Sequence, residues 1–353
     1  MKRICLLTLF LLIGFFNAKA QVIDVLTDLL GPQGILLNGN DLYVCEPHTT
    51  RVFKIDISDI AQTPTDVIHQ YSGQEFPRSL ALKGDMLYFS DYLGFKIQKV
   101  NINATLPTTT SNLVHNLSYP NCMVFNGNDL YFSQSLQNKI SKVDISAPTP
   151  TVTEIITGLD HPTGLAFNGD DLYFSQSGAN KISKIDISIA TPTVVDVVTN
   201  LSIPIELALN GDDLYFAQYG TNRISKIDIS IATPTVVDVV TGLDGPYGLA
   251  LNETDLYFSQ ASGDKISKIN LSSLSTNEFS TINSIKVYPN PSTDFINISG
   301  LIETKRFKIY NILGVEMLIG IISRNEKIDI KNLKNGIYFL KFDDGNTVKF
   351  IKD

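Results

Sequence analysis

Three acidic side chains interrupt an otherwise repetitive sequence. Glu46 and Asp91 stand where four other copies of a repeated phrase carry glutamine, namely Gln134, Gln176, Gln218 and Gln260. Glu206 is the one acid in a column that otherwise holds Gly34, Ser79, Cys122, Gly164 and Gly248. Carboxylates that meet at one point, with the Asn121 amide beside them, are oxygen ligands suited to a divalent cation such as Ca²⁺ or Mg²⁺. His48 follows Glu46 by two residues, a spacing that suits a general acid or base beside a metal-bound carboxylate.

A second set of residues varies around a proline that the repeats share, found at positions 32, 77, 120, 162, 204 and 246. Tyrosine supplies apolar area with a hydroxyl handle, and arginine and asparagine supply hydrogen-bond donors. We therefore predict a ligand-binding set consisting of Arg78, Tyr92, Tyr119, Asn121, His161, Tyr219 and Tyr247. The alternative for this region is an acidic, hydrated funnel whose strand-end glutamines bond the backbone between blades.

The elements that must position these residues follow from an internal repeat. A Leu-Tyr-Phe phrase, which reads Leu-Tyr-Val in its first copy, places its leucine at 42, 87, 130, 172, 214 and 256, so the period is 42 to 45 residues. Each unit divides into four strand-like pieces separated by Asn-Gly, Gly-Asn or Thr-Pro turns. Four antiparallel strands per 40 to 45 residues are typical of one propeller blade.

The ends of the repeat region predict how the ring closes. The last unit stops after its third strand, and Val22 to Leu26 matches the outer strand Val236 to Val240. Pairing of these two pieces in one sheet removes an exposed edge. We expect an all-β fold in which residues 21–272 form a six-bladed β-propeller closed by the N-terminal strand. In such a blade the turns before strand one and after strand two share a face, so the variable residues should surround the mouth of the central channel.

The repeat also resembles known families. Asn180 to Asp186, which follows Leu172 to Gln176, resembles NHL-type repeats and the gluconolactonase group. Together with Gly245-Pro246-Tyr247-Gly248, the same phrase resembles the repeats of virginiamycin B lyase. The resemblance implies the propeller fold over residues 21–272. The gluconolactonase group further implies Glu, Asn and Asp side chains as metal ligands in the channel.

Both termini carry targeting signals. Lys2 and Arg3, an apolar run to Phe16 and a final Ala-Lys-Ala predict a signal peptide over residues 1–20. Residues 273–283 read as a polar linker, and residues 284–353 as a small Ig-like β-sandwich. The phrases Tyr288 to Pro291, Asn311 to Gly314 and Leu333 to Tyr338 resemble the type A C-terminal sorting domain of the type IX secretion system of Bacteroidetes. The resemblance implies export to the medium or the cell surface with that secretion machinery as partner; a generic Ig-like binding module is the alternative.

Composition narrows the classes of partner. The 353 residues carry a formal net charge of −8. Residues 21–283 hold 14 basic and 28 acidic side chains, a net of −14, whereas residues 284–353 hold 11 and 8, a net of +3. Such an acidic propeller argues against nucleic acid. No apolar stretch after the signal peptide reaches the ~20 residues of a transmembrane helix, and Cys45 and Cys122, on non-adjacent blades, are expected to be free, buried thiols.

Two main functions remain open from these residues. The first is a secreted or cell-surface binding propeller that takes a protein, glycan or small ligand on its variable face. The second is a divalent-metal-dependent lactonase or lyase that uses Glu46, Asp91, Glu206 and Asn121, with His48 as acid or base. A structural spacer without a ligand is a third possibility.

Overall fold

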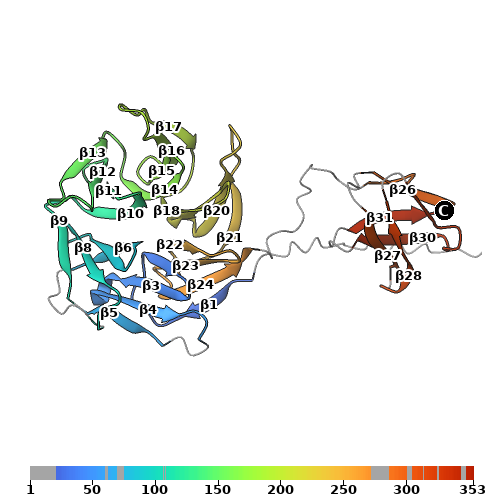
Figure 1. The fold of residues 1–353 in the computed structure, drawn as a ribbon, viewed down its shortest axis with the longest axis horizontal. Helices are drawn as coiled ribbons and strands as arrows, with labels where there is room; N and C mark the ends of the chain where they lie inside the picture. The colour runs from blue at the N-terminus through green and yellow to red at the C-terminus, as the bar shows by residue number, and fades with distance from the viewer. Residues whose placement is uncertain are drawn as a thin grey trace, which may run out of the picture. The chain divides into compact units, whose positions relative to one another are not determined.

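The computed structural model describes residues 21–59, 63–69, 75–105, 107, 109–271, 286–299, 304–312, 314–323, 326–342 and 347–353. The predicted signal peptide and the whole of the predicted linker lie outside the described residues. The chain divides into two compact units, Met1–Leu274 and Ser275–Asp353, and each is described by itself (Figure 1).

The first unit consists of six antiparallel four-stranded sheets arranged as the blades of a propeller (Figure 1). Blade 1 contains β2 (Ile35–Asn38), β3 (Asp41–Glu46), β4 (Arg51–Asp56) and β5 (Thr65–His69). Blade 2 contains β6 (Pro77–Lys83), β7 (Met86–Asp91), β8 (Lys96–Asn101) and β9 (Ser111–His115). Blade 3 contains β10 (Pro120–Asn126), β11 (Asp129–Gln134), β12 (Lys139–Asp144) and β13 (Val152–Ile156).

The remaining blades repeat this order. Blade 4 contains β14 (Pro162–Asn168), β15 (Asp171–Gln176), β16 (Lys181–Asp186) and β17 (Val195–Val198). Blade 5 contains β18 (Pro204–Asn210), β19 (Asp213–Gln218), β20 (Arg223–Asp228) and β21 (Val237–Thr241). Blade 6 contains β22 (Pro246–Leu251), β23 (Asp255–Gln260) and β24 (Lys265–Asn270). Short 3₁₀ turns, η1 (Pro47–Thr49) and η2 (Tyr219–Thr221), follow β3 and β19.

The N-terminal strand closes the ring, as the repeat arithmetic predicts. Strand β1 (Ile23–Leu26) pairs antiparallel with β24 and so becomes the outer strand of blade 6. Asp24 accepts hydrogen bonds from the Ser267 hydroxyl at 2.7 Å and from the Lys265 ammonium at 3.0 Å. Blades 4 and 5 form the same serine–aspartate bond between strands three and four, Ser183 to Asp196 and Ser225 to Asp238. The closing strand therefore reproduces the side-chain bonding of an ordinary blade.

The Leu-Tyr-Phe phrase builds the core between blades. Residues of one strand alternate between its two faces, so Leu and Phe point to one side of the sheet and Tyr to the other. Leu130 and Phe132 accordingly pack with Tyr88 of blade 2, and Leu172 and Phe174 pack with Tyr131 of blade 3. Both faces of each second strand are buried, which explains why this phrase is the least variable part of the repeat.

The first strands of neighbouring blades touch around the central channel. A Cβ atom at Gly164 would collide with the backbone of Ile205 and Glu206, and one at Gly248 with the backbone of Gln33. The serine that follows the Leu-Tyr-Phe phrase hydrogen-bonds to the first strands of its own blade and of the next blade. The Ser133 hydroxyl, for example, accepts from the Cys122 amide of its own blade and donates at 2.7 Å to the Thr163 carbonyl of blade 4.

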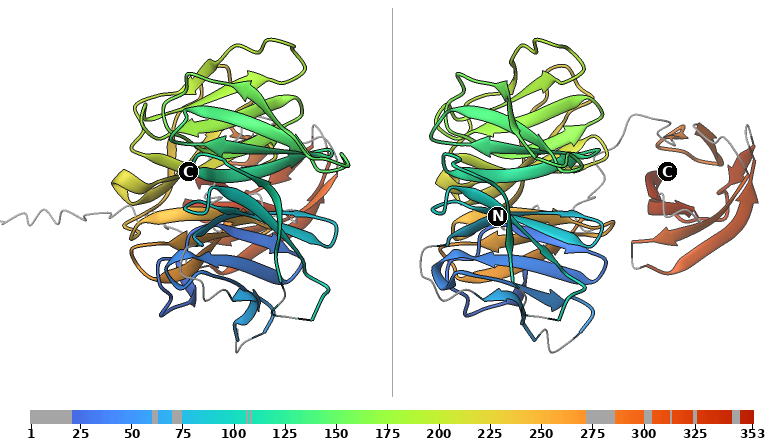
Figure 2. Two further views of the ribbon diagram at one scale, coloured as in Figure 1. Left: turned by 90° about the vertical axis from the view of Figure 1, so that its left-hand side faces the viewer. Right: turned by 60° about the vertical axis from the view of Figure 1, so that its left-hand side comes forward.

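The second unit consists of two antiparallel sheets around one core (Figure 2). The smaller sheet contains β25 (Lys286–Tyr288), β26 (Phe295–Ser299) and β29 (Lys327–Asp329). The larger contains β28 (Glu316–Ile322), β27 (Lys305–Asn311), β30 (Gly336–Phe342) and β31 (Thr347–Lys352) in that order. Ile296, Ile309, Leu340 and Phe350 are fully buried between them.

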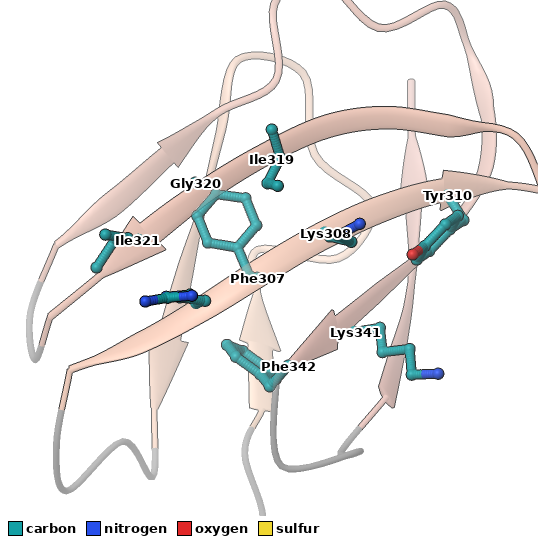
Figure 3. Close-up of a pocket in the computed structure, with 9 residues that line it drawn as sticks. Phe307, Lys308, Tyr310, Ile319, Gly320, Ile321, Lys341 and Phe342 are labelled. Carbon is teal, nitrogen blue, oxygen red and sulfur yellow. The ribbon is translucent and has the colours of Figure 1, made fainter.

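A pocket of about 720 Å³ lies on the larger sheet of this unit (Figure 3). Its lining includes Ile319, Ile321, Lys308 and Lys341 from strands β28, β27 and β30. Within the described residues, no helix is both long enough and apolar enough to cross a membrane.

Candidate functional site

The variable residues lie on one face of the propeller. In blades 2 to 6 the shared proline at the start of strand one pairs with the last residue of strand two, as in Pro77 with Asp91 and Pro120 with Gln134. The loop that enters strand one and the loop that leaves strand two therefore lie next to each other. We call the face formed by these loops the mouth.

The strand-end glutamines serve as internal clamps of each blade. The Gln176 carbonyl accepts from the Asp160 amide at 2.9 Å, and its amide donates at 2.9 Å to the Ser183 hydroxyl. Gln134, Gln218 and Gln260 make the equivalent pair of bonds. These side chains join the entry loop to strand three of the same blade, with one bond to a backbone amide and one to a serine hydroxyl, and not to the backbone of a neighbouring blade as the alternative expected.

Glu46 and Asp91 take the same structural role. Glu46 Oε1 accepts from the Leu30 amide at 2.6 Å, while Oε2 accepts from the Thr49 hydroxyl and from Arg51 Nε. Asp91 Oδ1 accepts from the Phe76 and Gly94 amides, and Oδ2 lies 3.5 Å from Lys96 Nζ. Burial raises the pKa of Asp91.

The structure does not bring the three predicted metal-binding acids together. Glu46 and Asp91 are 2% and 0% exposed inside their own blades, whereas Glu206 faces the channel. Among the described residues no group of three or more His, Cys, Asp or Glu side chains is placed to hold a metal ion. The carboxylates of Glu46 and Asp91 are already bonded to their own blades.

The two histidines of interest lie at the rim of the mouth. His48 is exposed in η1, and its ring meets the edge of Phe76 with centroids 5.8 Å apart. His161 is also exposed, and its Nδ1 lies 3.1 Å from an Asp160 carboxylate oxygen. Neither imidazole belongs to the pocket described next.

A pocket of about 340 Å³ opens at the mouth. Residues from five blades line it: Gln33, Arg78, Thr163, Ile203, Tyr219 and Tyr247 are among them. Three of the predicted ligand-binding residues, Arg78, Tyr219 and Tyr247, therefore share one cavity. Its size lies at the lower end of the range for small-molecule sites.

Arg78 is the central group of this pocket. Its guanidinium carbon lies 4.1 Å from the centroid of the Tyr92 ring and 5.3 Å from that of Tyr247. Arg78 Nε donates to the Tyr247 hydroxyl, which donates in turn to Asn121 Oδ1 at 3.4 Å. Tyr119 packs edge-on against Tyr92 with centroids 4.9 Å apart. Burial raises the pKa of Tyr247 to about 12, so its phenol is neutral.

The Arg78 cation has no carboxylate within 4 Å among the described residues. Arginine keeps its charge at every physiological pH. Arg78 is half-buried, and stacking on Tyr92 stabilises its cation.

Gln33 lines the pocket although the predicted ligand-binding set did not include it. Its Oε1 is buried and has no hydrogen-bond donor within the described part of the chain. A buried acceptor without a donor costs about 1–3 kcal/mol. The sequence feature that could have identified Gln33 is its position directly after Pro32, which corresponds to the position of Arg78 after Pro77.

Glu206 lies deeper in the channel than the mouth pocket. It lines a second cavity of about 260 Å³, whose walls come from the first strands of the six blades. The Cys122 thiol donates to Glu206 Oε1 at 3.0 Å. Burial raises the pKa of Glu206 to about 7, and the Arg78 charge opposes that rise. Cys45 and Cys122 are free and buried, as expected.

Residues 286–353 match the family model of the secretion system C-terminal sorting domain. This match agrees with the type IX signature in the sequence and marks the protein for secretion to the cell surface or the extracellular space. No curated protein sequence matches the chain.

Solved structures share the propeller fold at low sequence identity. Virginiamycin B lyase from Staphylococcus aureus is 19% identical, with a TM-score of 0.54 over 71% of this chain and 99% of that one. A protein provisionally assigned as a gluconolactonase is 12% identical, with a TM-score of 0.58 over 72% and 93%. A nidogen/laminin complex contains a chain that is 17% identical, with a TM-score of 0.51 over 62% and 84%. At these identities the likeness establishes the fold and leaves the chemistry to the residues of this chain.

Proposed function

We propose that this secreted propeller is a binding module that takes the carboxylate of an extracellular ligand into its mouth pocket. The observation that carries the proposal is the Arg78 guanidinium, which lines the pocket and has no carboxylate partner among the described residues. Tyr92 and Tyr247 hold the group in place on two sides.

The arrangement suits recognition better than catalysis. Because one face of the guanidinium stacks on Tyr92 and Nε is engaged by Tyr247, its orientation is set before a ligand arrives. A pre-oriented guanidinium binds a carboxylate through two parallel hydrogen bonds, which are about twice as strong as neutral ones. Little side-chain entropy is then lost on binding.

A metal-dependent lactonase or lyase finds less support in the geometry. Two of its three acids, Glu46 and Asp91, are committed to amide, hydroxyl and cationic partners inside their blades. The relatives of like fold include a lyase and also a chain from a nidogen/laminin complex. One fold thus accommodates either kind of function.

Calorimetric titration of the purified protein tests the proposal. N-acetylglycine and glucuronic acid are expected to bind, while N-acetylglycinamide, which has the same shape without the charge, is not. If neither carboxylate binds at millimolar concentration, the proposal fails. Titration with Ca²⁺ and Mg²⁺ addresses the alternative: one tight site that disappears in Glu206→Gln would favour the metal-dependent enzyme instead.

A further inference from the structure

The residues around Arg78 bear on what carries the carboxylate. Besides Arg78, Gln33 lines the pocket, and its side-chain oxygen Oε1 has no hydrogen-bond donor among the described residues. A ligand that satisfies both groups presents an anion and an N–H close together. The last residue of a polypeptide has this combination, because its amide N–H lies on the same α-carbon as its terminal carboxylate.

The wall beside these polar groups is apolar and comes from blade 5. Ile203 and Tyr219 line the pocket and remain 43% and 38% exposed. A hydrogen bond of 3.1 Å from the Tyr219 amide to the Ile203 carbonyl joins the two loops. Exposed large side chains of this kind favour an apolar ligand surface.

Ile203 adopts a backbone conformation that its side chain disfavours. Its φ is +48°, and the equivalent positions in blades 1 and 6 are Gly31 and Gly245 at +61° and +62°. A β-branched residue in this region is strained by about 1–3 kcal/mol and is retained where the surroundings hold it. Here the Asn180 side chain accepts from the Ile203 amide at 2.8 Å. The equivalent residues Tyr119 and His161 of blades 3 and 4 have φ values of +50° and +48°, so this turn presents a side chain at the mouth in these blades as well.

Further exposed apolar side chains belong to other loops of the mouth. They belong to the entry loop of blade 1 and to the loops after the second strands of blades 2 and 3, and comprise Leu30, Leu93, Phe95 and Leu136 at 39–58% exposure. The exposed acid Asp160 lies on the same face, in the entry loop of blade 4. The propeller carries a net of −14 over residues 21–283. A chain with one terminal charge therefore suits this face better than a polyanionic sugar with a charge on each unit.

We propose that the mouth binds the C-terminal end of an apolar polypeptide segment. The terminal carboxylate pairs with Arg78, the last amide N–H donates to Gln33 Oε1, and the apolar side chains lie on Ile203 and Tyr219. This inference rests on the proposed function and specifies its ligand.

Calorimetry with matched peptides tests it on the purified protein. Acetyl-Gly-Leu-Leu with a free carboxylate is expected to bind at least 10-fold more tightly than N-acetylglycine, and its C-terminal amide at least 10-fold more weakly than the free acid. Ile203→Gly is expected to lose at least 5-fold in peptide affinity while its Tm stays unchanged or rises. Ile231→Ser, which alters an exposed isoleucine on a strand-connecting turn outside the mouth, is the control and should bind normally.

The outcomes separate the two proposals. If N-acetylglycine binds and the leucine peptide gains nothing, the polypeptide ligand is wrong and the carboxylate-binding function stands. Tighter binding of a glucuronate disaccharide than of the peptide likewise overturns it in favour of a glycan. If the peptide and its amide bind equally, the role of Arg78 fails, and both proposals fall with it.

Discussion

Arg78 Nε donates a hydrogen bond to the hydroxyl of Tyr247, although blade 1 separates the two blades that carry these residues. Tyr247 passes the bond on to Asn121 of blade 3. Residues from the first strands of three blades thus form one chain of hydrogen bonds across the top of the channel. The position of the cation depends on the closed ring and not on any single blade.

Replacing Tyr247 by phenylalanine tests this relationship. The ring and its packing against Arg78 remain, while the acceptor for Nε and the donor to Asn121 are lost. We expect a loss of about 1–3 kcal/mol in the free energy of unfolding, because a buried donor loses its partner. Affinity for N-acetylglycine should fall about 5-fold or more because the guanidinium is less well oriented. Urea denaturation and calorimetry provide the two measurements; Tyr173→Phe, away from the mouth, is the control for ligand affinity.

Glu206 predicts a defined pH dependence of stability. Its pKa is raised by burial from 4.5 to about 7 in the folded protein. A carboxyl with a raised pKa favours the folded state most below pH ~4.5, and this contribution is lost as pH rises to 7. At 1.36 kcal/mol per pKa unit, the loss amounts to about 3 kcal/mol. Glu206→Gln should therefore flatten the curve of unfolding free energy between about pH 4.5 and 7; a variant whose curve retains the wild-type slope in this range would contradict the assignment.

The closing strand makes a further prediction. Asp24→Ala removes the bonds from Ser267 and Lys265 that join β1 to β24. The buried Ser267 hydroxyl then lacks this acceptor, which should cost about 1–3 kcal/mol of unfolding free energy. Asp238→Ala removes the equivalent bonds inside blade 5 and is the matched control. Amide hydrogen exchange should accelerate in β24 for Asp24→Ala only; equal exchange there in both variants would count against a closure role for Asp24.

The serine of the repeated phrase links neighbouring blades. Ser133→Ala leaves the Thr163 carbonyl of blade 4 and the Cys122 amide without this partner. Because both groups are buried, we expect a loss of about 1–3 kcal/mol in a chemical denaturation experiment. Ser135→Ala, two residues further along the loop, removes only a longer bond of 3.4 Å and is the control. Similar losses in the two variants would show that the inter-blade bond has no special weight.

The periodicity of the sequence predicted the fold because the length and number of the repeats determine how many blades there are and how the ring closes. Six Leu-Tyr phrases spaced 42 to 45 residues apart and one unpaired outer strand leave a closed six-bladed ring as the arrangement without a free edge. The mouth also followed, since loops alternate between faces, and Arg78, Tyr219 and Tyr247 do share a pocket.

The orientation of individual side chains could not be predicted from the sequence. Glu46 and Asp91 replace glutamine. The same replacement would be seen in the sequence whether the carboxylate faced the channel or, as here, accepted hydrogen bonds from its own blade. The positive φ of Ile203 and the unpaired oxygen of Gln33 exist only in the folded backbone. The bond between Arg78 and Tyr247 joins residues 169 positions apart, and no local pattern encodes it.

A double-mutant cycle tests the central claim, that Arg78 pairs with a ligand carboxylate. The affinities of acetyl-Gly-Leu-Leu and of its C-terminal amide are measured by calorimetry on the wild-type protein and on Arg78→Gln, with circular dichroism to verify that the variant is folded. Our account predicts that the preference for the free acid is lost in the variant, a coupling of about 1.5–3 kcal/mol, as expected for hydrogen bonds to a charged group. An equal preference for the acid in both proteins, with a coupling near zero, would contradict it.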